Sequence, residues 1–181
     1  MRTLLLSLAV LLAADMVRAE EPVVHEATKL SFPETLAGFK RGDSAGYTIE
    51  GKPLLSVPYH GDGVEATIFV RPADVKNPRT AKQLVDESIA TAEKIAGYKD
   101  VKKFVGKDDT DAADWAQGGF TAKSAEGAFV FSLVGIKVRD EHVIKLRITA
   151  SKPDTEKVTA FFKEFQRLAE GEKKLRTHSE R

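Results

Sequence analysis

The stretch AFVFSLVGIKVRDEHVIKLRITA, residues 128–150, decides the fold of this 181-residue chain. Residues 128–138 carry apolar side chains at both odd and even positions, which is typical of a central strand covered on both faces. Residues 142–150 alternate instead, which indicates a strand that is buried on one face. Their inward positions are Ile144, Leu146 and Ile148, and their outward positions are Lys145, Arg147 and Thr149. The two runs flank residues 139–141 and therefore predict a β-hairpin.

Shorter strand-like runs precede this hairpin. They are residues 29–32, 38–41, 47–49, 54–59, 64–70, 101–105 and 115–123. The sequence His-Gly-Asp-Gly at residues 60–63 is typical of a hairpin turn. Pro58 places its strand at an edge or a bulge, since proline has no N–H for the ladder. Gly118 and Gly119 together predict a bulge or bend.

Two helices complete the pattern. For the first, Asn77 and Pro78 fit the N-cap and first helical position, and Thr80 with Gln83 fits a capping box one turn on. Its apolar stripe is Ala81, Leu84, Val85, Ile89, Ala92 and Ile95, and Gly97 ends it. The second helix has Ser151 or Asp154 as its cap and Gly171 as its stop. Its buried face is Val158, Phe161, Phe162, Phe165 and Leu168.

A central strand covered on both faces requires a layer on each side of its sheet. The expected fold class is therefore α+β, an antiparallel β-sheet of about six strands flanked by two main helices. Residues 29–170 are expected to form this single domain. Residues 20–28 are expected to be a flexible lead-in, and residues 171–181 a charged C-terminal tail.

The N-terminus has the layout of a secretory signal peptide. Arg2 precedes an apolar run at residues 4–14, and Val17 and Ala19 are small residues at the −3 and −1 positions. Eleven residues in a helix are far shorter than the roughly 30 Å hydrocarbon core. We expect cleavage after Ala19, with Ala14 as an alternative, and a periplasmic or secreted mature chain without a membrane span.

Composition excludes several kinds of site. The chain has no cysteine, so disulfides, thiolate metal sites and cysteine nucleophiles are excluded. It has 28 basic and 27 acidic residues, and removal of residues 1–19 takes away two basic and one acidic residue, leaving 26 of each. A balanced charge predicts no nucleic-acid partner.

Two motifs overlap in the sequence RGDSAG, residues 41–46. The G-x-S-x-G pattern at residues 42–46 needs its serine, Ser44, on a turn that leads into a helix. The following YTIEGKP segment is β-prone and cannot open a helix, so a tight turn is the expected structure. Arg41-Gly42-Asp43 spells an adhesion tripeptide that recurs by chance. No catalytic residue is predicted.

Candidate ligand residues are few. The acidic segment at residues 107–114 has Ala113 where a Ca²⁺ loop needs an oxygen ligand. The four histidines, His25, His60, His142 and His178, have no metal-binding spacing, so no metal site and no cofactor are predicted. Trp115, the only tryptophan, can anchor a ligand or belong to the core. Trp115, His60 and His142 are the candidate binding residues.

The order of elements and some local text resemble the PsbP-like superfamily. The matching segments are SFPETLAGFKR at residues 31–41, VEATIFVRP at 64–72, GYKDVKK at 97–103, the 128–150 hairpin and the Phe-rich last helix. The resemblance covers about residues 29–170. It implies an α/β/α sandwich that binds partners and has no recognised enzymatic activity, and it carries over no functional residue.

Two functional hypotheses follow. The first is a secreted or periplasmic, non-enzymatic binding or assembly module with an unknown protein or small-molecule partner. The alternative is a small periplasmic hydrolase or ligand-binding protein whose cleft is formed by residues distant in sequence. A pocket that holds His60 or His142 beside a carboxylate would favour the alternative.

Overall fold

A computed structural model describes residues 21–49, 51–106 and 114–171. The expected signal peptide at residues 1–19, nearly all of the acidic segment, and the tail from residue 172 lie outside these ranges. The histidine at position 178 lies outside them too.

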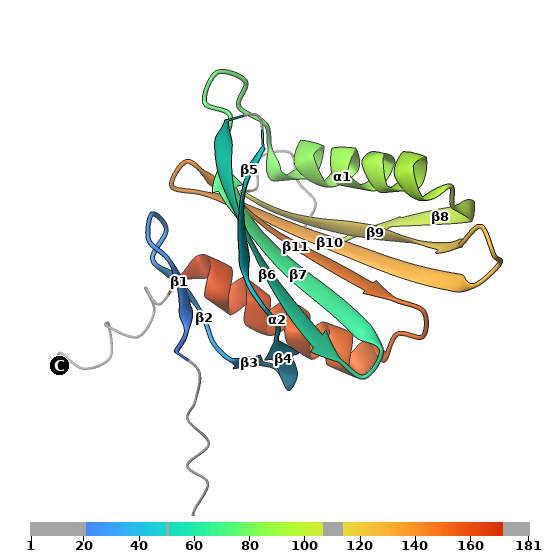
Figure 1. Ribbon diagram of the computed structural model, residues 1–181. Coiled ribbons are helices and arrows are strands. Elements are labelled where there is room, and N and C mark those ends of the chain that lie inside the picture. Colours follow the sequence, from blue (N-terminus) through green and yellow to red (C-terminus); the bar gives the residue numbers. More distant parts are fainter. Residues whose placement is uncertain (1–20, 50, 107–113, 172–181) are drawn as a thin grey trace, which may run out of the picture.

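A large antiparallel sheet forms the body of the described chain (Figure 1). Its strands are β3 (Thr35–Leu36), β4 (Phe39–Arg41), β5 (Ala45–Ile49), β6 (Lys52–Gly61), β7 (Val64–Pro72), β8 (Lys99–Val105), β9 (Trp115–Lys123), β10 (Phe129–Arg139) and β11 (His142–Ala150). Their order is β3-β4-β6-β7-β11-β10-β9-β8, and β5 pairs with β6 beside β4. A separate two-stranded ribbon consists of β1 (Val23–His25) and β2 (Leu30–Phe32).

The expected sheet of about six strands flanked by two helices is wrong, because the described residues form a nine-stranded sheet and a second ribbon. The long strand β6 accounts for part of the difference, since it pairs with β4 near one end and with β5 near the other. The short strands β3, β4 and β5 thereby join the sheet although each has only two to five residues. The sequence indicated strand-like runs at residues 38–41 and 47–49, whereas the two-residue strand β3 is too short to show a periodicity.

The segment expected as a flexible lead-in, residues 20–28, also differs. Strand β1 begins at Val23 and pairs with β2, and Thr28 is buried. Leu30 and Phe32 of β2 are buried in the main core and fasten the ribbon there. The buried Arg41 reinforces the attachment, because its guanidinium donates to the carbonyl oxygens of Phe32 and Glu21.

Two helices, α1 (Ala81–Ala96) and α2 (Thr155–Glu170), pack on opposite faces of the sheet (Figure 1). The alternation in β11 shows this: Ile144 belongs to the core under α2, and the next residue toward the N-terminus, Val143, belongs to the core under α1. The α2 core also takes residues from β2, β6 and β7, whereas the α1 core draws on β9 and β10. Helix α1 therefore covers only part of its face.

The helix boundaries follow from local signals. Thr80 caps α1 in a capping box with Gln83, as predicted, and Gly97 ends the helix with a φ of 59°. Asn77 and Pro78 lie before the helix. Asp154 caps α2 by accepting from two backbone N–H groups, so this one of the two predicted caps is confirmed. Neither helix in the described ranges combines the length and apolarity needed to cross a membrane.

Of the bulge or bend predicted at Gly118 and Gly119, the bulge is wrong. The β9–β10 register runs without a break through both residues. Their role is close packing, because a Cβ at Gly118 would lie 3.0 Å from Val85 of α1. On the other face, a Cβ at Gly135 would lie 2.7 Å from the ring of Phe162 in α2. Because glycine has no side chain, these positions on β9 and β10 thus allow both helices to pack close to the sheet.

Candidate functional site

The RGDSAG segment provides neither a nucleophile elbow nor a free adhesion loop. Ser44 is exposed in the connection between β4 and β5, so a strand follows it where the hydrolase pattern needs a helix. Arg41 is buried by the carbonyl contacts that hold the ribbon. The segment therefore serves the fold.

The histidine candidates lie on different parts of the sheet. His60 is exposed on β6, opposite Glu65 in the register. His142 begins β11 and meets the ring of His25 from β1, with ring centroids 5.5 Å apart. Burial, and then the charge of His142, lowers the pKa of His25, and Glu26 partly opposes this. This pair could not be found from sequence, since His25 and His142 meet only through the fold.

Trp115 belongs to the core on the α2 side. Its ring lies 5.6 Å from the rings of both Phe162 and Phe165, measured between centroids. Its Nε1 is buried without a hydrogen-bond partner among the described residues. Trp115, His60 and His142 are thus not brought together. Among the described residues, no group of three metal-ligating side chains is found.

A groove on the other face, beside α1, gathers polar side chains that the sequence did not single out. Its volume is about 280 Å³, at the lower end for small-molecule sites. Neither His60 nor His142 lines it. Its wall is α1, and its floor comes from β7, β10 and β11. The lining residues are Arg71, Leu84, Glu87, Ser88, Thr91, Ala92, Ser132, Val134, Ile136, Val143, Lys145 and Arg147.

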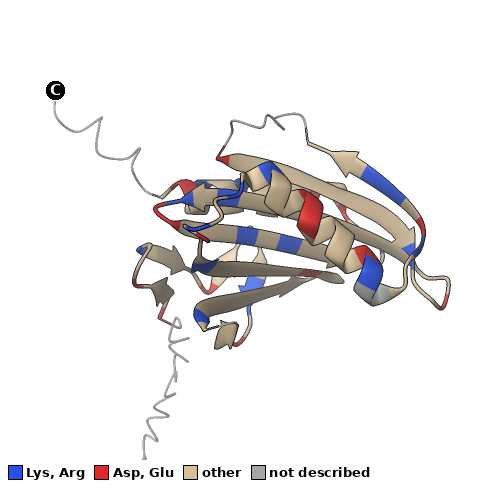
Figure 2. Ribbon diagram, turned by 90° about the horizontal axis from the view of Figure 1, so that it is seen from above, with Lys and Arg blue, Asp and Glu red and all other residues tan. Residues whose placement is uncertain are grey.

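Three basic side chains converge in this groove. Arg71 stands on β7, where it is paired in register with Val143 of β11. Lys145 and Arg147 follow Val143 at two-residue steps, so all three project from the α1 face. Figure 2, seen from above, shows Lys and Arg positions on the strands beside α1. All three are half-buried, and this concentrates positive charge inside the groove.

The surroundings disfavour this charge. Burial, followed by the positive charges of Arg147 and Arg71, lowers the pKa of Lys145 to about 8. Burial, followed by the positive charge of Arg79, lowers the pKa of Arg71, although Glu87 and Asp74 oppose the shift. A bound anion would offset these penalties, because opposite charges nearby favour the protonated forms.

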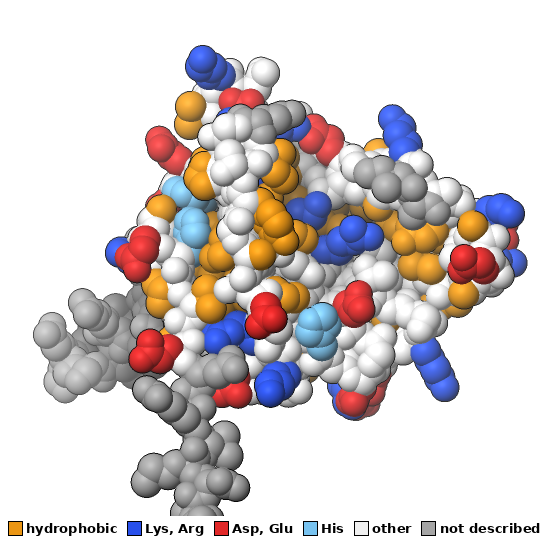
Figure 3. Space-filling model, in the orientation of Figure 1, with side chains coloured by type: hydrophobic (Ala, Val, Ile, Leu, Met, Phe, Trp, Pro, Cys, Tyr) orange, Lys and Arg blue, Asp and Glu red, His pale blue; other side chains and the backbone are white. Residues whose placement is uncertain are grey.

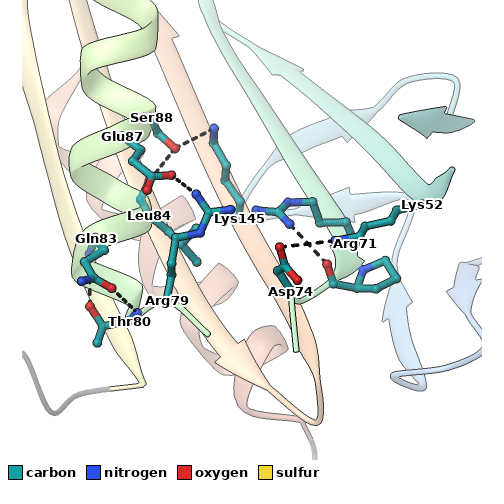
Figure 4. Close-up of polar contacts among 11 residues, drawn as sticks. Lys52, Arg71, Asp74, Arg79, Thr80, Gln83, Leu84, Glu87, Ser88 and Lys145 are labelled. Carbon is teal, nitrogen blue, oxygen red and sulfur yellow. Dashed lines mark hydrogen bonds and ion pairs between the residues drawn. The ribbon is translucent and has the colours of Figure 1, made fainter. Parts of the chain in front are cut away.

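Carboxylates near the groove are engaged elsewhere (Figure 4). Glu87 of α1 forms an ion pair with Arg79, and Asp74 lies 3.8 Å from Lys52. Within the described ranges, none of the three groove cations has an ion pair. Arg71 donates only to the Pro72 carbonyl, at 3.2 Å, and Lys145 to a hydroxyl of α1. The groove therefore holds basic groups without acidic partners.

The hydroxyl that Lys145 contacts is held in place by the helix. Ser88 Oγ accepts from Lys145 Nζ at 3.0 Å and donates to the Leu84 carbonyl at 2.7 Å (Figure 4). Both bonds keep its proton on the helix backbone, which suits a positioning role better than a nucleophilic one. Ser88 thus fixes the amine of Lys145 against the wall of the groove.

Ser132 contributes a second polar group. Its side chain is 1% exposed, and its Oγ has no hydrogen-bond partner in the described part of the chain. A buried hydroxyl without a partner costs free energy, on the order of 1–3 kcal/mol. Because Ser132 lines the groove, a polar ligand or water there can satisfy it.

A second, more apolar hollow adjoins the first. Its volume is about 190 Å³, and it shares Arg71, Val143 and Lys145 with the groove. Leu54 of β6 and Phe69 of β7 line its other side. The Lys145 Nζ lies 6.0 Å from the centroid of the Phe69 ring. The basic groove thus opens onto an apolar surface.

Part of this site has a signal in the sequence. Lys145 and Arg147 were predicted to face outward from their strand. This outward direction is the part of the site that the sequence indicates. The convergence of these residues depends on the pairing of β7 with β11, which local sequence does not specify.

No protein-family model matches this chain, and no curated protein matches its sequence. The groove itself therefore carries the functional argument.

Proposed function

We propose that this protein is a binding module whose groove beside α1 takes a small anionic ligand. The observation that carries the proposal is the convergence of Arg71, Lys145 and Arg147, none of which forms an ion pair within the described part of the chain. Guanidinium and ammonium groups form charge-assisted hydrogen bonds with carboxylate, sulfonate or phosphate oxygens, and guanidinium can do so in two-point contacts. The unpartnered hydroxyl of Ser132 adds a donor for such a ligand.

The hydrolase alternative lacks its distinguishing feature. It required a pocket with His60 or His142 beside a carboxylate, and neither hollow described above contains them. Binding without catalysis therefore remains the proposal, in agreement with the partner-binding role that the PsbP-like resemblance implies.

Fluorescence titration with the anionic probe 8-anilinonaphthalene-1-sulfonate tests the proposal. We expect saturable binding that weakens about tenfold or more in Lys145→Met and in Arg147→Met, since each loses a charge-assisted contact. The affinity should also fall above pH 8, as Lys145 loses its proton. Lys163→Met, a matched change on the exposed side of α2, should bind as wild type does. Equal affinity in all four proteins would refute the proposal.

We further propose that the chain works outside the cytoplasm. The support is the N-terminal layout at residues 1–19. Expression of the full chain in a Gram-negative bacterium, followed by fractionation and N-terminal sequencing, tests it. We expect periplasmic protein that begins at Glu20, or at Asp15 if cleavage follows Ala14. Intact protein confined to the cytoplasm would contradict it.

A further inference from the structure

We propose that the anionic ligand is a monomeric single-chain amphiphile, an aliphatic carboxylate, whose head lies in the basic groove and whose tail lies over β7, β6 and β5. This inference rests on the anion-binding function proposed above and names the class of ligand. It follows from the way in which the two hollows join and from the apolar surface beyond them.

The two hollows have different characters at their two ends. The end under α1 holds the three cations, the hydroxyls of Ser88 and Ser132, and the carboxylate of Glu87, which is paired with Arg79. The other end is bounded by Leu54 and Phe69, whose side chains offer no hydrogen bonds. A ligand that fills both hollows must therefore be charged at one end and apolar at the other.

An apolar row continues outward from the second hollow. Leu54 is paired in register with Tyr47 of β5, so the two side chains are neighbours on the same face. Ile49 follows Tyr47 on that face. Tyr47 is 54% exposed and Ile49 is 56% exposed, because α1 packs over β9 and β10 and leaves β5 uncovered. In Figure 3, basic side chains lie among hydrophobic ones below the position of α1, and hydrophobic side chains continue over β5 and β6.

The distribution of charge along this row favours a ligand with a single anionic group, located at the inner end. At the inner end, the three basic groups form no ion pair with any described residue, and the one lining carboxylate, Glu87, is paired with Arg79. At the outer end, Lys52 is paired in register with Ile49 and its amine lies 3.8 Å from a carboxylate oxygen of Asp74. Among the described residues, the basic group at the outer end is therefore paired with a carboxylate, which favours a neutral tail over a second anionic group.

A free amphiphile fits better than a membrane surface. Sites for anionic membranes present exposed Lys and Arg side chains to the lipid headgroups. Here Arg71, Lys145 and Arg147 are half-buried between a helix and a sheet, and Lys145 bonds to Ser88 inside the groove. A headgroup in a bilayer cannot reach such a site without leaving the bilayer.

Calorimetric titration with straight-chain carboxylates of four to twelve carbons, each below its micellar concentration, tests the inference. We expect affinity to rise about three- to fourfold for each added methylene, since each buries apolar surface, until the tail passes Tyr47. Leu54→Ser and Tyr47→Ser should flatten this rise without changing the affinity for butyrate. Tyr47 is exposed on β5, so its variant is expected to remain folded. Phe129→Ser, at a 48% exposed residue of β10, should keep the full rise.

The outcomes separate this inference from the function on which it rests. Affinity that does not depend on chain length, together with charge-dependent binding of the sulfonate probe, would overturn the amphiphile and leave anion binding standing. Binding to anionic phospholipid vesicles without binding to monomeric carboxylates would also overturn it. Loss of charge-dependent binding for every probe would overturn both.

Discussion

At the scale of single residues, Lys145 carries a charge that its surroundings disfavour. Its pKa is about 8 in the folded protein, against about 10.4 for an exposed lysine. Between these values the unfolded chain binds the proton more strongly, so the penalty is complete below pH 8 and disappears as pH rises to about 10.5. The protonated amine therefore destabilises the folded state at neutral pH.

We predict that the free energy of unfolding of wild type rises relative to that of Lys145→Met between pH 7.5 and 10.5. The expected difference is on the order of 2 kcal/mol. Urea unfolding of both proteins at several pH values measures it, with Lys163→Met as the control that should parallel wild type. Parallel curves for Lys145→Met and wild type would contradict the burial of this charge.

A second residue-scale prediction concerns Gly135. An added methyl group there would lie 2.7 Å from the ring of Phe162, so Gly135→Ala should overpack the α2 side and cost about 1–3 kcal/mol. Gly46→Ala is the matched control, because a Cβ there meets no atom within 4 Å and the change should fall within about 0.5 kcal/mol. Denaturant midpoints compare the two. Equal midpoints would show that α2 can shift to make room.

The sequence predicts the face of the strand from which each of these side chains projects, but it does not predict that the side chains lie close together. The alternation in residues 142–150 placed Lys145 and Arg147 on the outer face, and they do project opposite to Ile144 and Leu146. The sequence could not place Arg71 beside them, since that contact depends on a register between strands about 70 residues apart. The sequence pattern of one strand does not specify the distant strand with which it pairs or the register of that pairing.

At the scale of elements, two capping signals compete at the start of α1. Thr80 Oγ1 accepts from the Gln83 N–H, and Asn77 lies three residues before this cap. We predict that Thr80→Ala costs about 1 kcal/mol of stability, because the Gln83 N–H loses its side-chain acceptor. Asn77→Ala should be close to neutral. Thermal unfolding distinguishes them, and a larger loss in Asn77→Ala would place the functional cap one turn earlier.

The helices were predictable because their signals are local. A cap, a 3.6-residue stripe and a terminal glycine lie within one window of sequence, and Thr80, Asp154 and Gly97 act as expected. The short strands were less predictable. Strand β3 has two residues, and β1 lies in the segment expected to be flexible. Their structure comes from partners elsewhere in the chain, so local propensity does not reveal it.

At the scale of the whole molecule, the expected strand count failed for the same reason. The long strand β6 gathers two short strands along one edge, which extends the sheet past the six strands expected. The candidate site also exists only at this scale, because its residues come from β7, α1, β10 and β11. The residues expected to bind, Trp115, His60 and His142, lie apart.

Ligand binding should stabilise the whole fold. A ligand that binds only the folded state adds about 2.7 kcal/mol at a hundredfold excess over its Kd. We predict that decanoate at this excess raises the denaturant midpoint of wild type, and that Arg147→Met at the same ligand concentration shows a smaller rise. Decylammonium at equal concentration serves as the charge-reversed control. An equal rise with both compounds would indicate that charge plays no part.

The pairing of β7 with β11 also constrains how the chain reaches its native state. The register joins Pro72 to His142, so the seam closes only after a loop of about 70 residues has been brought together. Such distant pairing slows folding, and until it forms β7 presents an unpaired edge that invites association with other chains. A nascent chain that has not yet reached β11 can complete neither the sheet nor the groove. Assembly of the binding site is therefore a late event, and occupancy of the groove would report that β11 has been synthesised and has paired with β7.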